Sequence, residues 1–94
     1  MSDYQRYTVL PVRKVFEIAD EILPERAGVE RTRASRHSVT YTGQEGTVTL
    51  DAHRHGVATD VIARTNQLRT SKLDGAVRFL FNQLPYQPGD PPRE

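Results

Sequence analysis

Residues that could bind a metal alternate in the segment Asp51-Ala52-His53-Arg54-His55. Alternate residues of a strand share one face of a sheet, so two imidazoles with this spacing can approach one ion. Two features argue against a metal site. His55 with Gly56 has the composition of a tight turn and so leaves the alternation, and we expect His37 to lie on the opposite, apolar face. We therefore expect a solvated strand end, with no bound metal and no cofactor.

Acid–base catalysis is a second possible chemistry, and it depends on how the predicted strands pair. The predicted register sets Asp51 directly across from Asp60, with His53 and Arg36 as neighbours on the same face. A carboxylate pair beside a histidine can perform general acid–base catalysis. The alternative is a solvated face on which Arg36 compensates the repulsion of the two carboxylates. Because the sequence predicts no pocket around them, an acid–base enzyme is only the second alternative function.

Arginines in the middle of the chain point to a third chemistry, which is contact with phosphates. Four of them lie on or near the predicted polar face of the sheet: Arg36, Arg54, Arg64 and Arg69. Nucleic-acid binding requires such residues on one surface, ideally with exposed aromatic rings for stacking. The aromatic residues here fall mostly on helix stripes and strand faces, and the net charge is only +1. A nucleic-acid-binding module that uses this face is the first alternative function.

Two helices must position these residues. From Val12 onward apolar residues recur at i, i+3, i+4, i+7, i+10 and i+11, and Pro24 predicts a helix end between Leu23 and Arg26. A second helix is expected after Arg69. Ser71 and Asp74 have the spacing of a capping box, and Pro85 ends the helix.

Three strands with one apolar face lie between the helices. A turn at Gln44-Glu45 joins the first two strands, and a turn at His55-Gly56 joins the second to the third. Segments 4–10 and 29–35 carry weaker strand signals, the first as an edge strand and the second as an irregular edge strand or an extended lead-in. The turns predict the pairs Tyr41 with Val48, Val39 with Leu50, Ala52 with Thr59, Leu50 with Val61 and Val48 with Ala63.

These elements predict an α+β fold in the order β-α-β-β-β-β-α. An antiparallel sheet of about four strands would carry both helices on its apolar face, as a two-layer sandwich. The other face is polar and rich in threonine. We expect residues 1–84 to form one domain and residues 85–94 to form an extended, proline-rich tail.

The composition excludes several classes of protein. With no cysteine among its 94 residues, the chain has no disulfide, thiolate zinc site or thiol nucleophile. No segment has the roughly 18 apolar residues that a membrane span needs, and the N-terminus lacks a signal sequence, so we expect a cytoplasmic protein. The hydrophobic fraction of 36% predicts a thin core, and small domains of this kind often complete their cores by self-association.

Apolar residues outside the helix stripes suggest where another molecule binds. Ile18 and Phe79 fall outside their stripes, and Phe81 lies at the edge of one. A single sheet cannot cover both sides of a helix, so either the tail with Tyr86 or a second subunit must cover them. The leading hypothesis is therefore a small non-enzymatic binding or assembly domain that acts through homo-oligomerisation, as a dimer, or through a protein partner. No motif identifies a family.

Overall fold

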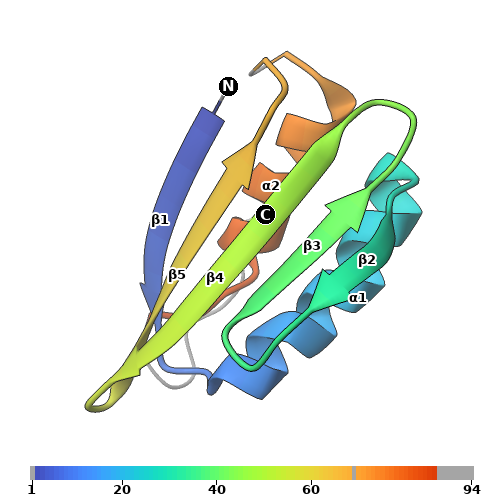
Figure 1. Cartoon of the computed structure of the whole chain (residues 1–94). Helices are drawn as coiled ribbons and strands as arrows, with labels where there is room; N and C mark the ends of the chain where they lie inside the picture. Colours follow the sequence, from blue (N-terminus) through green and yellow to red (C-terminus); the bar gives the residue numbers. More distant parts are fainter. Residues whose placement is uncertain (1, 69, 87–94) are drawn as a thin grey trace.

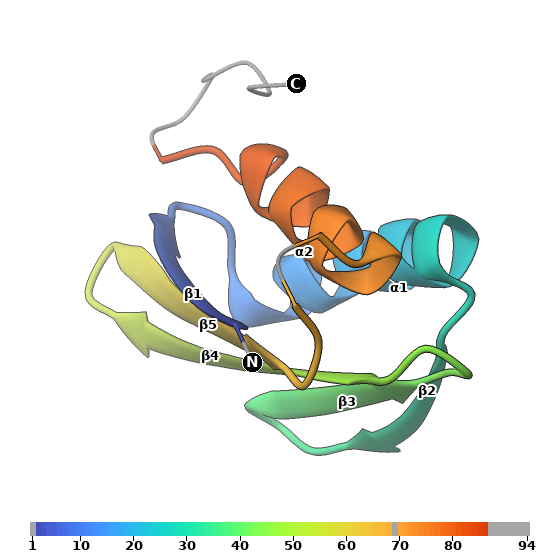
Figure 2. The same ribbon diagram turned by 90° about the horizontal axis from the view of Figure 1, so that it is seen from above.

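The described part of the computed structural model comprises residues 2–68 and 70–86, and it forms five strands and two helices. The strands form one antiparallel sheet in the order β1-β5-β4-β3-β2, and both helices pack on the same face of it (Figures 1 and 2). The predicted α+β two-layer sandwich is confirmed, with five strands in place of about four. The elements are β1 (Ser2–Thr8), α1 (Val12–Ala27), β2 (Glu30–Ala34), β3 (Ser38–Thr42), β4 (Thr47–His55), β5 (Ala58–Thr65) and α2 (Lys72–Asn82).

Helix α1 extends one residue beyond its predicted end. Pro24 lies inside the helix rather than terminating it, because a proline in the last turn removes one hydrogen bond and leaves the preceding turns intact. The helix ends at Gly28, which adopts the left-handed conformation (φ 67°) and donates its N–H to the carbonyl of Pro24 at 3.0 Å. Four residues of the apolar stripe of α1 are buried and its Val12 and Ile22 are partly buried: the buried ones are Val15, Phe16, Ala19 and Leu23.

Helix α2 begins at the predicted cap. The side-chain oxygen of Ser71 accepts a hydrogen bond from the backbone N–H of Asp74 at 3.0 Å. The helix buries Leu73, Val77 and Leu80 against the sheet and α1. No helix within residues 2–68 and 70–86 is long and apolar enough to cross a membrane.

The first hairpin has its predicted register, whereas the second is shifted. Tyr41 pairs with Val48 as expected, but Ala52 pairs with Val61 rather than Thr59. His55 pairs with Ala58, so the turn is formed by Gly56 and Val57, with Gly56 at φ 61°. A shift of two residues leaves every side chain on its original face, so the apolar pattern does not distinguish the two registers.

The two edges of the sheet differ. Strand β1 pairs with β5 along its whole length, from Ser2 to Thr8. Strand β2 has an irregularity between Arg31 and Arg33, and all its residues are exposed. Bulges and exposed charges of this kind protect an edge strand from further pairing.

Candidate functional site

The surface without a helical cover is the face of the sheet opposite α1 and α2, which we call the outer face. Its side chains alternate along each strand with those that are buried beneath the helices. Hydrogen bonds between threonine hydroxyls join neighbouring strands. The Oγ1 atoms of Thr40 and Thr49 lie 3.1 Å apart, and so do those of Thr32 and Thr42. The outer face comprises Asp3, Gln5, Tyr7, Glu30, Thr32, Arg33, Ser38, Thr40, Thr42, Thr47, Thr49, Asp51, His53, His55, Ala58, Asp60, Ile62 and Arg64.

The two carboxylates proposed for acid–base chemistry do not face each other. Asp51 lies opposite Ile62, and Asp60 lies opposite His53, because the second hairpin is shifted by two residues. Each carboxylate has a different partner. The Arg64 guanidinium lies 2.9 Å from Asp51, and the Gln5 amide donates to Asp60 at 2.8 Å. The expected opposition is therefore wrong, and the arginine that pairs with Asp51 is Arg64 rather than Arg36.

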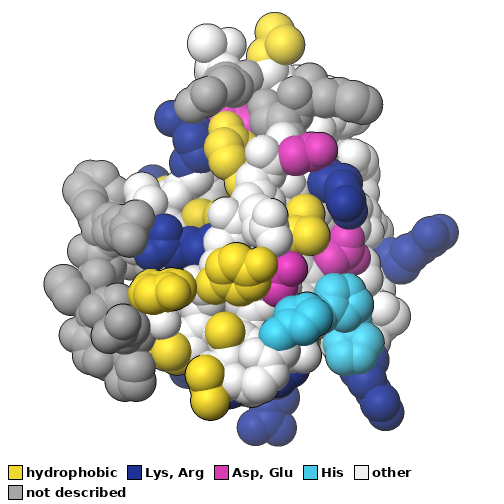
Figure 3. Space-filling model, turned by 90° about the vertical axis from the view of Figure 1, so that its left-hand side faces the viewer, with side chains coloured by type: hydrophobic (Ala, Val, Ile, Leu, Met, Phe, Trp, Pro, Cys, Tyr) yellow, Lys and Arg dark blue, Asp and Glu magenta, His cyan; other side chains and the backbone are white. Residues whose placement is uncertain are grey.

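The histidines lie closer together than the sequence predicted. The ring centroids of His37 and His53 are 5.0 Å apart, which contradicts the placement of His37 on the apolar face. Residues 36 and 37 form a bend before β3 begins at Ser38, so the strand alternation does not reach His37. Figure 3 shows the histidine side chains gathered in one patch beside acidic side chains.

The four candidate arginines do not form a basic patch within the described residues. Arg54 donates to the carbonyl oxygens of Val9 and Leu10 and to the hydroxyl of Thr59, so it ties the end of β4 to the segment after β1. Arg64 is paired with Asp51, and Arg36 is exposed in the bend between β2 and β3. Arg69 lies outside the described residues.

The apolar residues expected at an interface are largely covered within the chain. Phe81 is only 6% exposed, and its ring meets that of Tyr4 edge-on at 6.4 Å. Ile18 is partly buried against the core, and the Arg26 guanidinium lies 3.4 Å from the ring centroid of Phe79. The two helices cover each other's flanks, which an expectation based on the sheet alone could not include. Tyr86 is 55% exposed, and the tail beyond it lies outside the described residues.

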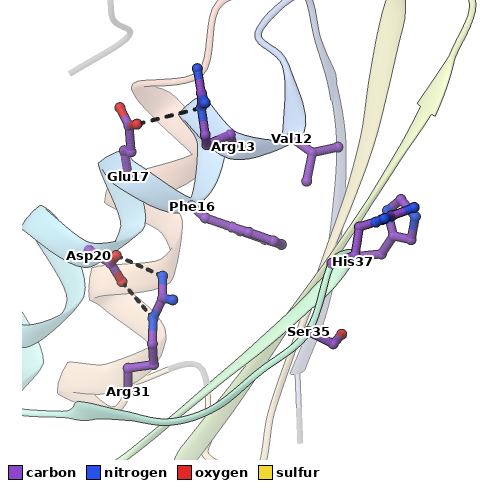
Figure 4. Close-up of a pocket in the computed structure, with 9 residues that line it drawn as sticks. Val12, Arg13, Phe16, Glu17, Asp20, Arg31, Ser35 and His37 are labelled. Carbon is purple, nitrogen blue, oxygen red and sulfur yellow. Dashed lines mark hydrogen bonds and ion pairs between the residues drawn. The ribbon is translucent and has the colours of Figure 1, made fainter.

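A groove of about 410 Å³ opens between α1 and the hairpin of β2 and β3 (Figure 4). Phe16 and Val12 supply its apolar surface. At one end, Asp20 accepts hydrogen bonds from Arg31 at 3.2 and 2.7 Å and from the hydroxyl of Tyr41 at 2.6 Å. Local sequence patterns do not predict this network, because its members come from α1, β2 and β3. The charges in it satisfy one another, so the network joins the two layers and offers no reactive group.

The network changes the acidity of two of its members. Burial raises the pKa of the Tyr41 phenol, and the hydrogen bond and charge of Asp20 raise it further, while Arg31 opposes the change. Burial lowers the pKa of Arg31, but the hydrogen bonds and charge attraction of Asp20, with a contribution from Tyr41, outweigh it and raise the pKa overall. Tyr41 is thus held protonated in the folded chain.

Raising the pH should destabilise the wild-type chain more than a Tyr41→Phe variant. The unfolded chain releases the phenol proton above the ordinary pKa of 10.0, whereas the folded chain retains it. The stabilisation is complete below that value and is lost as the pH rises above it, with a limiting slope of about 1.4 kcal/mol per pH unit for one proton. Denaturant unfolding of both proteins on either side of this pH measures the difference. Parallel declines of the two proteins would contradict the expectation.

Comparisons with known proteins add no functional information. The sequence matches no protein-family model and no curated protein. The function must therefore be inferred from the surfaces described above.

Proposed function

We propose that this protein is a small, non-enzymatic assembly domain that pairs with a second copy of itself through the outer face of its sheet. One observation carries the proposal: both helices lie on one side of a five-stranded sheet, and within the described residues the other side has no cover (Figure 2). Two such faces can pack together as sheet against sheet, which would leave the helices on the two outer sides of the pair.

The size of the outer face supports pairing with a partner of the same size. Five strands spaced about 4.8 Å apart and about 20 Å long present on the order of 500 Å². Two copies face to face would bury about 1,000 Å² in total, which reaches the lower limit for a specific interface. A reversible dimer is therefore the expected assembly.

The chemistry of the outer face is self-complementary. In a two-fold symmetric pair, a residue of one copy meets a different residue of the other, so a face with both charge signs can satisfy itself. Asp51, Asp60 and Arg64 supply the two signs, and the threonine hydroxyls both donate and accept hydrogen bonds. Tyr7, which is 47% exposed, adds apolar area at the β1 edge.

The two alternative functions have less support. A nucleic acid would require a concentration of unpaired positive charge, whereas Arg54 and Arg64 are engaged within the chain. An acid–base enzyme would require Asp51 and Asp60 to act together, and they pair with different neighbours.

Thr49→Glu should shift the protein from dimer to monomer. Thr49 lies on the central strand β4, and Arg64 stands directly opposite it, so the new carboxylate gains a partner within the folded chain. A second copy would have to desolvate this charge, and we expect the dissociation constant to rise at least about tenfold, or ~1.4 kcal/mol. Light scattering coupled to size exclusion measures the mass at several concentrations and at low and high salt.

Thr70→Glu is the matched control, because the same substitution then lies at an exposed residue just before α2, away from the outer face. It should leave the dimer unchanged. A wild-type chain that stays monomeric at the highest soluble concentration contradicts the proposal. So does a Thr49→Glu variant that is folded by circular dichroism and still dimerises like the control.

A further inference from the structure

We propose that His37, His53 and His55 form a binding site for a divalent transition-metal ion of the zinc class on the outer face, where β3 begins and β4 ends. They are the only histidines of the chain, and all three are exposed. His37 comes from the bend before β3, and the other two come from the end of β4. All its ligands come from one chain, and because His53 also belongs to the outer face, the site borders the surface proposed above for assembly.

The distance between two of the rings fits a shared ion. In a tetrahedral zinc site the metal lies about 2.0–2.1 Å from each imidazole nitrogen, which places the centroids of two ligating rings about 5 Å apart. The centroids of His37 and His53 are 5.0 Å apart, and their planes are inclined by 30°. An ion can therefore bridge these rings through side-chain rotation, without separating β3 from β4.

The third ligand requires a change of rotamer. No three His, Asp or Glu side chains within the described residues already stand as a ligand set. His55 follows His53 by two residues, so it lies on the same side of β4 at the end of the strand. Because its side chain is exposed, rotation toward the pair is not opposed by packing, and water can fill the remaining position.

The surroundings favour a cation with an affinity for nitrogen. Imidazole ligands suit zinc, copper and nickel better than magnesium or calcium. Asp60 faces His53 directly from β5, and its free oxygen can accept the second N–H of a ligating imidazole. The nearest described arginine on β4, Arg54, is turned toward the segment after β1, where it bonds the carbonyls of Val9 and Leu10.

Zinc chloride titrated into the full chain at neutral pH tests the site by calorimetry. We expect one ion per chain and a rise in melting temperature, because the ion ties the start of β3 to the end of β4. His37→Gln and His55→Gln should each weaken binding at least about tenfold, as the loss of a ligand should exceed that of an outer-shell partner. Arg36→Gln, next to His37 but not a ligand, is the control and should bind at least as tightly as the wild type, because it removes a positive charge near the ion.

The decisive outcome is that of His37→Gln. If this variant binds zinc as tightly as the wild type, the ion is held adventitiously by the pair on β4 and the proposed site is wrong. The absence of zinc binding by the wild-type chain also overturns it. Retention of binding in Thr49→Glu supports a site within one chain, whereas loss of binding in that folded monomer would place the ion between subunits and contradict the proposal.

Discussion

Leu50→Ala is expected to lower the free energy of unfolding by about 2–5 kcal/mol. Leu50 lies on the central strand β4 with no exposed surface, where it pairs with Val39 on one side and Ala63 on the other. Both helices rest on this layer, so the structure cannot collapse fully into the space that the side chain leaves. Domains of this size have about 5–15 kcal/mol of stability in total, so the variant should keep only part of it. Urea unfolding followed by circular dichroism measures the loss.

Ile62→Ala is the matched control on the opposite face of the sheet. Ile62 lies on β5 across from Asp51 and is half-buried in the single chain. In dilute protein we expect a loss of less than about 1 kcal/mol, because little apolar surface is uncovered. A loss equal to that of Leu50→Ala in dilute protein would contradict the assignment of the two faces. A loss that grows with protein concentration would instead agree with pairing through the outer face.

The parts of the fold that sequence predicts well depend on local patterns. The apolar period of α1, the helix N-cap at Ser71 and the first hairpin each involve residues close together in the chain, and each is confirmed. The reciprocal half of the capping box is absent, because the Asp74 carboxylate bonds Tyr4 and Arg78 instead of the Ser71 N–H. The predicted register of the second hairpin is wrong. Side chains in a strand alternate with a period of two, so a register shifted by two residues buries the same apolar residues. Only the backbone conformation of Gly56 and Val57 decides between the registers.

The functional surfaces were harder to predict, because they depend on contacts between distant elements. The expected acid–base pair of Asp51 and Asp60 depends on the register of the second hairpin. In the observed register these two residues are not opposite each other. His37 lies on the face opposite to the predicted one, because a bend and not a strand carries it. The expected exposure of Phe79 and Phe81 does not hold, because Arg26 of α1 lies over the ring of Phe79 and Tyr4 of β1 packs against Phe81.

Asp74 is a second position at which a single change should have a large effect. The residue has no exposed surface, and its Oδ2 accepts hydrogen bonds from the Tyr4 hydroxyl at 2.7 Å and from Arg78 Nε at 3.1 Å. It thus joins β1 to the first turn of α2, across 70 positions of sequence. Asp74→Ala removes both charge-assisted bonds, and we expect a loss of about 2–3 kcal/mol in the free energy of unfolding.

Asp74→Asn separates the effect of these bonds from that of the charge. The amide oxygen of asparagine can still accept from both Tyr4 and Arg78, and a neutral amide is less costly to bury than a carboxylate. Since Oδ1 of Asp74 has no partner within the described residues, the amide nitrogen can occupy its place without losing a bond. We expect a stability within about 1 kcal/mol of the wild type.

A double-mutant cycle with Tyr4→Phe tests whether Asp74 acts through the Tyr4 hydroxyl. Alone, Tyr4→Phe should lower the free energy of unfolding by about 1 kcal/mol, because it removes one hydrogen bond and little packing. In the Asp74→Ala background the same change should cost clearly less, since the bond from the hydroxyl to Asp74 is already lost. If the two losses simply add in chemical denaturation at neutral pH, the contact between β1 and α2 is not what makes Asp74 important.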